Sequence, residues 1–183
     1  MLKKILLLAV LMSFSLNLYA HGNEWIGNAI IKDAKWSPVQ ISFWPVHLCG
    51  NRTTICGINL SPGLVGFSWK VYGISCGQIV LLGENNGLAA NIWSFGVINN
   101  GLAVGVFNAW GKNNGVSVGL ANFVYDKKSG RNTLQIGVFN QVNSGLQIGL
   151  LNYNPNALIP WMPLINFAIP RSVESSLKEL SVR

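Results

Sequence analysis

The chain has 183 residues, of which half are hydrophobic and only 10% are charged, and its formal net charge is +7. This length is sufficient for one domain with a real core. The charges are scattered and form no basic stripe interleaved with aromatic residues, which argues against nucleic-acid binding. No later segment reaches the length of a transmembrane helix, since the apolar stretch 157–170 is interrupted by Pro160 and Pro163.

The first part of the chain, 1–20, predicts a secretory signal peptide. Lys3 and Lys4 precede an uncharged apolar stretch at 5–12, and Ala20 is a small residue at a suitable cleavage point. The apolar stretch is shorter than the roughly 20 residues that span a bilayer, so we expect cleavage and not anchoring. A lipoprotein would have a cysteine directly after the cleavage point, but this chain has His21 there, which argues against a lipoprotein. Cleavage would leave the chain from 21 to 183 with a net charge of +7 − 2 = +5, because both lysines are removed.

The remaining chain is expected to form one domain. Strands are predicted at 39–49, 53–60, 64–75 and 77–82, with turns at Gly50-Asn51 and Ser61-Pro62-Gly63. The expected organisation is a signal peptide at 1–20, a single repeat-containing β-domain at 21–170, and a polar C-terminal tail at 171–183 with a short helix at 172–180.

An eight-residue repeat dominates the second half of the chain. Aliphatic residues alternate with small or polar ones, so that Leu146, Ile148 and Leu150 share one face of their copy. This period of two is typical of a strand and not of a helix. The clear copies are 101–108 (GLAVGVFN), 115–122 (GVSVGLAN), 133–140 (TLQIGVFN) and 145–152 (GLQIGLLN), and a weaker copy is 92–99.

Each clear copy has a glycine at its fifth position and an asparagine at its eighth. The glycine weakens a flat strand but suits a bend or the close approach of another layer. The asparagines have two interpretations, because they could form a ladder or could begin turns. These positions are Gly105, Asn108, Gly119, Asn122, Gly137, Asn140, Gly149 and Asn152.

Turn signals and spacing favour an antiparallel arrangement. Asn- and Gly-containing tripeptides end at 87, 101, 115 and 145, and these residues suit the tight turns of hairpins. The copies begin at 92, 101, 115, 133 and 145, so their spacings of 9, 14, 18 and 12 are irregular, whereas a solenoid should keep a steady period. The sequence therefore predicts an all-β fold: an antiparallel meander of about ten short strands forming a curved sheet or closed barrel, with a β-solenoid as the alternative.

Lys127, Lys128 and Arg131 are expected in a solvated hairpin loop.

The strand at 145–153 (GLQIGLLNY) resembles those of the bacterial surface-repeat proteins first noted in leptospires, which repeat a G-(L/V)-Q-(I/L)-G-L-(V/L)-N pattern after a signal peptide. An opening segment at 38–45 (PVQISFWP) and a closing segment at 158–167 (LIPWMPLINF) are also similar to that family. The copies before residue 100 are degenerate and irregularly spaced, which departs from the family pattern. The resemblance implies an exported, surface- or envelope-associated protein and brings no catalytic residues.

One motif has a catalytic form. Residues 115–119 (GVSVG) match G-x-S-x-G, the nucleophile elbow of α/β-hydrolases. That elbow needs a following helix and a later histidine, but His21 and His47 both precede Ser117. The other repeat copies have alanine or glutamine at this position, and the carboxylates of the chain are scattered. We therefore expect no catalytic residues, no cofactor and no enzymatic activity.

The three cysteines leave three interpretations open. Cys49 and Cys56 flank a turn and could close a short disulfide loop in an oxidising compartment, leaving Cys76 over. His47 and the cysteines are also ligand types that suit zinc, but their spacing matches no established site, and no metal is predicted. Otherwise the cysteines are reduced packing residues.

Two functional hypotheses follow. The first is an exported, envelope- or surface-associated structural or interaction protein, non-enzymatic, with envelope components as partners; it would be at the outer membrane or cell surface, or alternatively periplasmic or secreted. The alternative is a small integral outer-membrane β-barrel, since the strands approach membrane-spanning length. Leu146, Ile148 and Leu150 would face a protein core in a soluble domain and lipid in the barrel. The tryptophans suit strand and core positions, with a carbohydrate platform or an interfacial belt as alternatives.

Overall fold

The computed structural model describes residues 28–31, 34–43, 46–50, 52–126 and 133–168. The predicted signal peptide, the polar tail with its helix, and the expected loop with Lys127, Lys128 and Arg131 lie outside the described residues. The described chain contains eleven strands: β1 (Asn28–Ile31), β2 (Trp36–Phe43), β3 (Val46–Cys49), β4 (Thr54–Val71), β5 (Ile74–Asn85), β6 (Leu88–Asn99), β7 (Leu102–Asn113), β8 (Val116–Val124), β9 (Leu134–Gln141), β10 (Gly145–Tyr153) and β11 (Trp161–Ala168).

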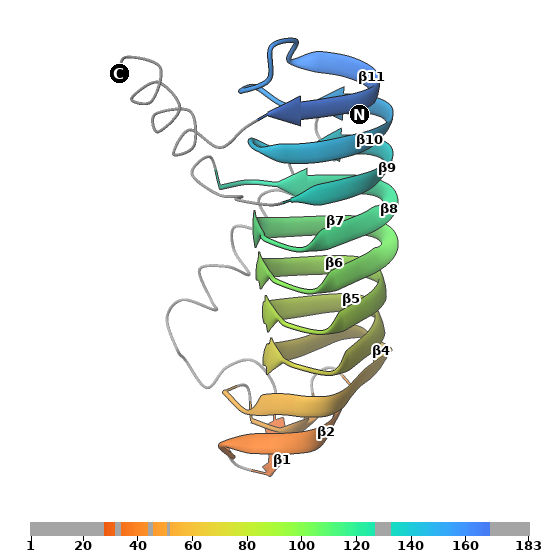
Figure 1. The fold of residues 1–183 in the computed structure, drawn as a ribbon. Helices are drawn as coiled ribbons and strands as arrows, with labels where there is room; N and C mark the ends of the chain where they lie inside the picture. Colours follow the sequence, from red (N-terminus) through yellow and green to blue (C-terminus); the bar gives the residue numbers. More distant parts are fainter. Residues whose placement is uncertain (1–27, 32–33, 44–45, 51, 127–132, 169–183) are drawn as a thin grey trace, which may run out of the picture.

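The strands stack as the coils of a β-solenoid of about eight turns (Figure 1). Their hydrogen-bonded order is β1-β3-β2-β4-β5-β6-β7-β8-β9-β10-β11, and every neighbouring pair from β4 to β10 is parallel. Within the described residues, antiparallel pairing is limited to β2 with β3 and β10 with β11. The predicted all-β class is confirmed. The antiparallel meander and the closed barrel are wrong, and the alternative, a β-solenoid, is the fold.

The irregular spacing that argued against a solenoid comes in part from one misplaced repeat copy. Leu88 pairs with Leu102, so the structural copy begins at Gly87 and not at residue 92. The coils then begin at 73, 87, 101 and 115, which are equally spaced, whereas the earlier start at 57 and the later starts at 133 and 145 depart from that interval. The Asn-Gly turns lead from each coil to the next, because residues that tolerate positive φ serve such a turn as well as a hairpin.

Each coil has a first arm and a second arm joined by a bend, and the bends follow one another along one edge of the solenoid (Figure 1). In β7 the inward–outward alternation shifts at Val106 and Phe107, which are both partly exposed, before Asn108 is again buried. Glycine precedes this bend because the coils approach closely there. A Cβ on Gly119 would lie 2.5 Å from the carbonyl oxygen of Gly105 in the neighbouring coil.

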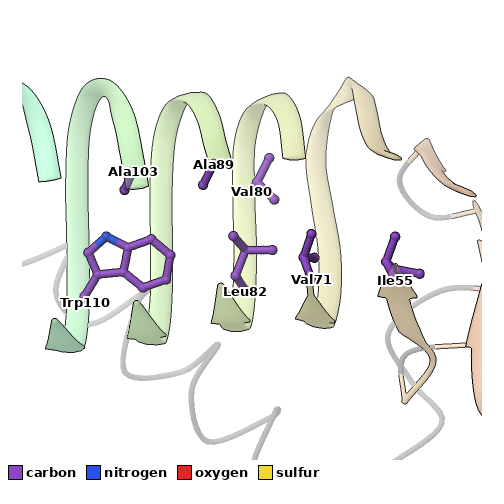
Figure 2. Close-up of a cluster of buried hydrophobic side chains, with 7 residues drawn as sticks. All are labelled: Ile55, Val71, Val80, Leu82, Ala89, Ala103 and Trp110. Atoms are coloured by element: carbon purple, nitrogen blue, oxygen red, sulfur yellow. The ribbon is translucent and has the colours of Figure 1, made fainter. Parts of the chain in front are cut away.

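Small and polar side chains fill most of the space between the arms. One buried row passes in register through successive coils and consists of Gln40, Asn59, Ser75, Ala89, Ala103, Ser117, Gln135 and Gln147. Hydrophobic packing is concentrated in the middle coils, where a buried cluster (Figure 2) contains Ile55, Val71, Val80, Leu82, Ala89, Ala103 and Trp110. The repeat's aliphatic residues point the other way, since Leu146, Ile148 and Leu150 are exposed. The expectation that this face forms an internal core is therefore wrong.

Candidate interaction surface

The four recurring asparagines form a ladder inside the solenoid. The Nδ2 of Asn108 donates to the Oδ1 of Asn122 at 3.0 Å, and the same bond joins Asn122 to Asn140 and Asn140 to Asn152, each at 2.8 Å. The first three amides also donate to a backbone carbonyl oxygen of the next coil at 3.1 Å. All four side chains are fully buried and belong to strands, so they are ladder residues and do not begin turns. Their mutual bonds give partners to amides that would otherwise be costly to bury, while the Oδ1 of Asn108, at the first position of the ladder, accepts no hydrogen bond from the described residues.

Two more asparagine ladders line the edge where the coils turn. The sequence pattern predicts only that the asparagines of these two ladders are turn residues. They nevertheless recur at the same interval as the starts of the coils. The buried ladder has bonds of 2.7 and 2.8 Å and consists of Asn85, Asn99 and Asn113. The exposed ladder has bonds of 2.9 and 2.8 Å and consists of Asn86, Asn100 and Asn114. The ladders hold successive coils in register and therefore keep the outer surface regular.

The outer surface of the first arms is an aliphatic wall. It has two rows in register across β6 to β10, and neither contains a charged residue. Ile58, Leu60 and Ile74 continue these rows toward the N-terminus. The rows are Leu88, Leu102, Val116, Leu134 and Leu146, and Ala90, Val104, Val118, Ile136 and Ile148.

A third row, the ridge, follows the bends. Each member directly follows the last residue of a first arm, which is Asn91 in β6 and a glycine in the other coils, and its exposed fraction lies between 44% and 67%. The ridge consists of Ile92, Val106, Leu120, Val138 and Leu150. The uncharged surface therefore continues around the bend edge of the coils.

Aromatic rings occupy the start of the second arms, beside the ridge. Phe107 and Phe123 have ring centroids 5.0 Å apart, and Phe123 and Phe139 are 5.2 Å apart. The aromatic column consists of Trp93, Phe95, Phe107, Phe123, Phe139, Trp161 and Tyr153, and neighbouring rings are at most 6.3 Å apart. Its side chains are partly exposed, in contrast to Trp110, which is buried inside.

A charged row lies at the far end of the second arms, next to the Asn-Gly turns. Lys70 pairs with Glu84 at 2.8 Å, and Lys112 pairs with Asp126 at 3.9 Å. The Lys70 ammonium holds the pKa of the Glu84 carboxyl below its ordinary value by donating a hydrogen bond, and the same bond raises the pKa of Lys70. Among the described residues between Gly57 and Ala168, every lysine, arginine, aspartate and glutamate belongs to this row.

Sequence reasoning missed the ridge, the aromatic column and the charged row. The charged row had a readable signal, because Lys70, Glu84, Lys112 and Asp126 recur at the interval of the Asn-Gly turns, with Ile98 between the two pairs. The ridge and the aromatic column depend on the bend, where the adjacent residues Val106 and Phe107 both point outward. A simple alternation of inward and outward residues does not predict such a pair.

The candidate nucleophile is an interior residue. Ser117 is fully buried, and its hydroxyl accepts a hydrogen bond from the Asn113 amide at 3.1 Å. It pairs with Ala103 and Gln135, as the repeat alignment predicts. Strands flank it on both sides, so the strand-to-helix turn of a hydrolase elbow is not found there.

The three cysteines form no disulfide in this structure. Cys49 is buried, Cys56 is exposed and Cys76 is half-buried, and all three are free thiols. A Cys49–Cys56 disulfide stays a prediction. His47 packs edge-on against Phe67 with ring centroids 5.9 Å apart. In the described part of the chain, no three His, Cys, Asp or Glu side chains gather as metal ligands could.

Comparison of the chain with protein-family models, with curated proteins and with solved structures finds no match. The described residues include no helix with the length and apolar character needed to cross a membrane.

Proposed function

We propose that this protein is an exported, non-enzymatic structural and interaction protein of the cell envelope or cell surface, and that it attaches through the aliphatic wall and the ridge. The observation that carries the proposal is the direction of the repeat: its aliphatic residues face outward, whereas its asparagines, glutamines and serines are buried. The predicted signal peptide and the resemblance to leptospiral surface-repeat proteins support export.

An uncharged aliphatic surface of this size is uncommon on a protein that stays free in water. Neighbouring strands are about 4.8 Å apart, so the coils from β6 to β10 carry the wall over roughly 20 Å. Monomeric soluble proteins rarely expose contiguous apolar patches beyond a few hundred Å², and larger ones mark interaction or membrane surfaces. The amide ladders give this surface a fixed shape, which suits adhesion.

Two valines provide a matched test. Val104 in the wall and Val97 on the second arm are both 38% exposed. Replacing either valine with lysine therefore adds one positive charge at a position of equal exposure. Cells expressing the untagged full-length protein would be fractionated after Val104→Lys or Val97→Lys. We expect the wild type and Val97→Lys in the envelope fraction, and Val104→Lys largely released.

Circular dichroism and thermal melting of both variants would show whether the solenoid is retained. Recovery of the wild type in the cytoplasm would overturn the proposal. Equal retention of the two folded variants in the envelope fraction would show that the aliphatic wall is not part of the attachment surface.

A further inference from the structure

We infer that the partner of the ridge is the acyl layer of a lipid surface, on which the solenoid lies with its bend edge down. This inference rests on the proposed function and adds the chemistry of the partner and the orientation of the protein. It commits to lipid and not to a second copy of the chain or another protein.

The order of side-chain rows from the bend edge to the opposite edge of the solenoid matches a water–lipid boundary. The ridge at the bend is wholly aliphatic, the first arm continues with the aliphatic rows, and the second arm begins with aromatic rings. The charged row and the asparagine ladders come last, at the opposite edge. Aromatic rings between apolar and charged zones are typical of residues at a membrane interface.

The dimensions of the coil are compatible with this orientation. The stretch of strand from Val106 of the ridge to Lys112 of the charged row corresponds to about 20 Å. Interfacial elements immerse their apolar face by about 5–10 Å. Immersion to that depth covers the ridge and the adjacent row with Val104, brings Phe107 and Phe123 to the interface, and leaves Lys112 in water.

The shape of the apolar surface favours lipid over a second copy. A flat partner could cover the aliphatic wall on one side of the coil, but the ridge and the aromatic column would stay exposed. The ridge is the more exposed part, as shown by Leu120 at 59% and Leu150 at 67%. Lipid chains can surround a ridge on both flanks because they form a fluid layer.

The distribution of charge is complementary to the same surface. Lys70, Glu84, Lys112 and Asp126 are all at the far edge, so immersion of the ridge desolvates none of them. The formal net charge of +7, or +5 without residues 1–20, is opposite in sign to anionic lipid headgroups. Apolar burial should nevertheless provide most of the affinity.

The first experiment is flotation of the protein, purified from the envelope fraction, with protein-free vesicles of phosphatidylcholine and phosphatidylglycerol. We expect co-flotation that persists in about 0.5 M NaCl, because apolar burial is not screened by salt. Val106→Lys should lower the partition coefficient at least about tenfold, since a charge is placed in the acyl layer. Val97→Lys, which adds the same charge elsewhere, should change it less than about twofold.

The second experiment measures orientation with nitroxide labels at Val106→Cys and Lys112→Cys, in a background with Cys56→Ser and Cys76→Ser. On vesicles, the label at 106 should be accessible to oxygen and shielded from a water-soluble nickel chelate, and the label at 112 should show the reverse. Equal accessibility of the two labels, or the opposite order, would overturn the orientation.

Other outcomes separate this inference from the proposed function. If the wild type is in the envelope fraction of cells but does not float with protein-free vesicles, the attachment stands and the lipid partner is wrong. A dimer that Val104→Lys dissociates would then identify a second copy as the partner. Flotation that disappears in salt would show that headgroup charge alone is recognised, and would also overturn the inference.

Discussion

Trp110 of β7 occupies the space that Gly96 leaves open in the neighbouring coil. The two residues pair in register, and a Cβ on Gly96 would lie 2.1 Å from Cζ3 of the indole ring. Trp110 is fully buried in the core cluster of Figure 2. The largest side chain of the interior is thus accommodated because the residue beside it has no side chain.

Gly96→Ala should destabilise the protein by about 1–3 kcal/mol, because the added methyl group forces the indole ring or the strand to move. Urea unfolding followed by circular dichroism would measure the change. The double variant Gly96→Ala with Trp110→Phe should recover part of the loss, since the smaller ring leaves room for the methyl group. Strictly additive effects of the two substitutions would contradict this packing.

The asparagine ladders differ in burial, and the effects of their loss should differ accordingly. Asn122→Ala should cost about 1–3 kcal/mol of unfolding free energy, because the buried amides of Asn108 and Asn140 each lose a partner. Asn114→Ala, in the exposed ladder, should cost less than about 0.5 kcal/mol, since water replaces its bond to Asn100. Chemical denaturation of the two variants in parallel makes the comparison, and similar losses would contradict it.

The Lys70–Glu84 pair should make a small, pH-dependent contribution to stability. The pKa of Glu84 is lowered in the folded state, so its contribution is present above the unfolded pKa and is lost as pH falls through the folded value. The pKa of Lys70 is raised, so its contribution is present below its unfolded pKa and is lost in strong alkali.

Thermal melts of the wild type and Glu84→Gln would test this pair. We expect a modest difference in melting temperature near neutral pH that disappears as the pH falls from about 5 to about 3. It should also shrink in about 0.5 M NaCl, because both side chains are partly exposed and screened. A difference that stays constant across this pH range would show that charge is not its cause.

Thiol labelling should follow the exposure of the cysteines. In the native protein, Cys56 should react fastest with maleimide, Cys76 more slowly, and Cys49 only after unfolding. Mass spectrometry of tryptic peptides gives the order. Protection of both Cys49 and Cys56 until a reductant is added would instead establish the disulfide that the sequence suggests.

Local pattern was enough to recognise the strands and the repeat. The alternation around Leu146, Ile148 and Leu150 indicates β-structure, and the glycine of each copy indicates a bend or a close approach. The position of Ser117 in the repeat also identified it as the small or polar residue of one copy and not a nucleophile, although its burial is known only from the structure. These conclusions depend on near neighbours within one repeat copy, which a single sequence displays.

The direction of stacking and the inward face could not be read in this way. An Asn-Gly turn can lead into a hairpin or into the next coil, and the difference lies in hydrogen bonds between residues such as Leu88 and Leu102. A period of two separates two faces without saying which one is buried. Here the polar face is inside, because buried asparagines at matching positions bond to one another between adjacent coils, as Asn108 does to Asn122. That partner exists only after parallel, in-register stacking, and the same stacking turns the aliphatic residues outward.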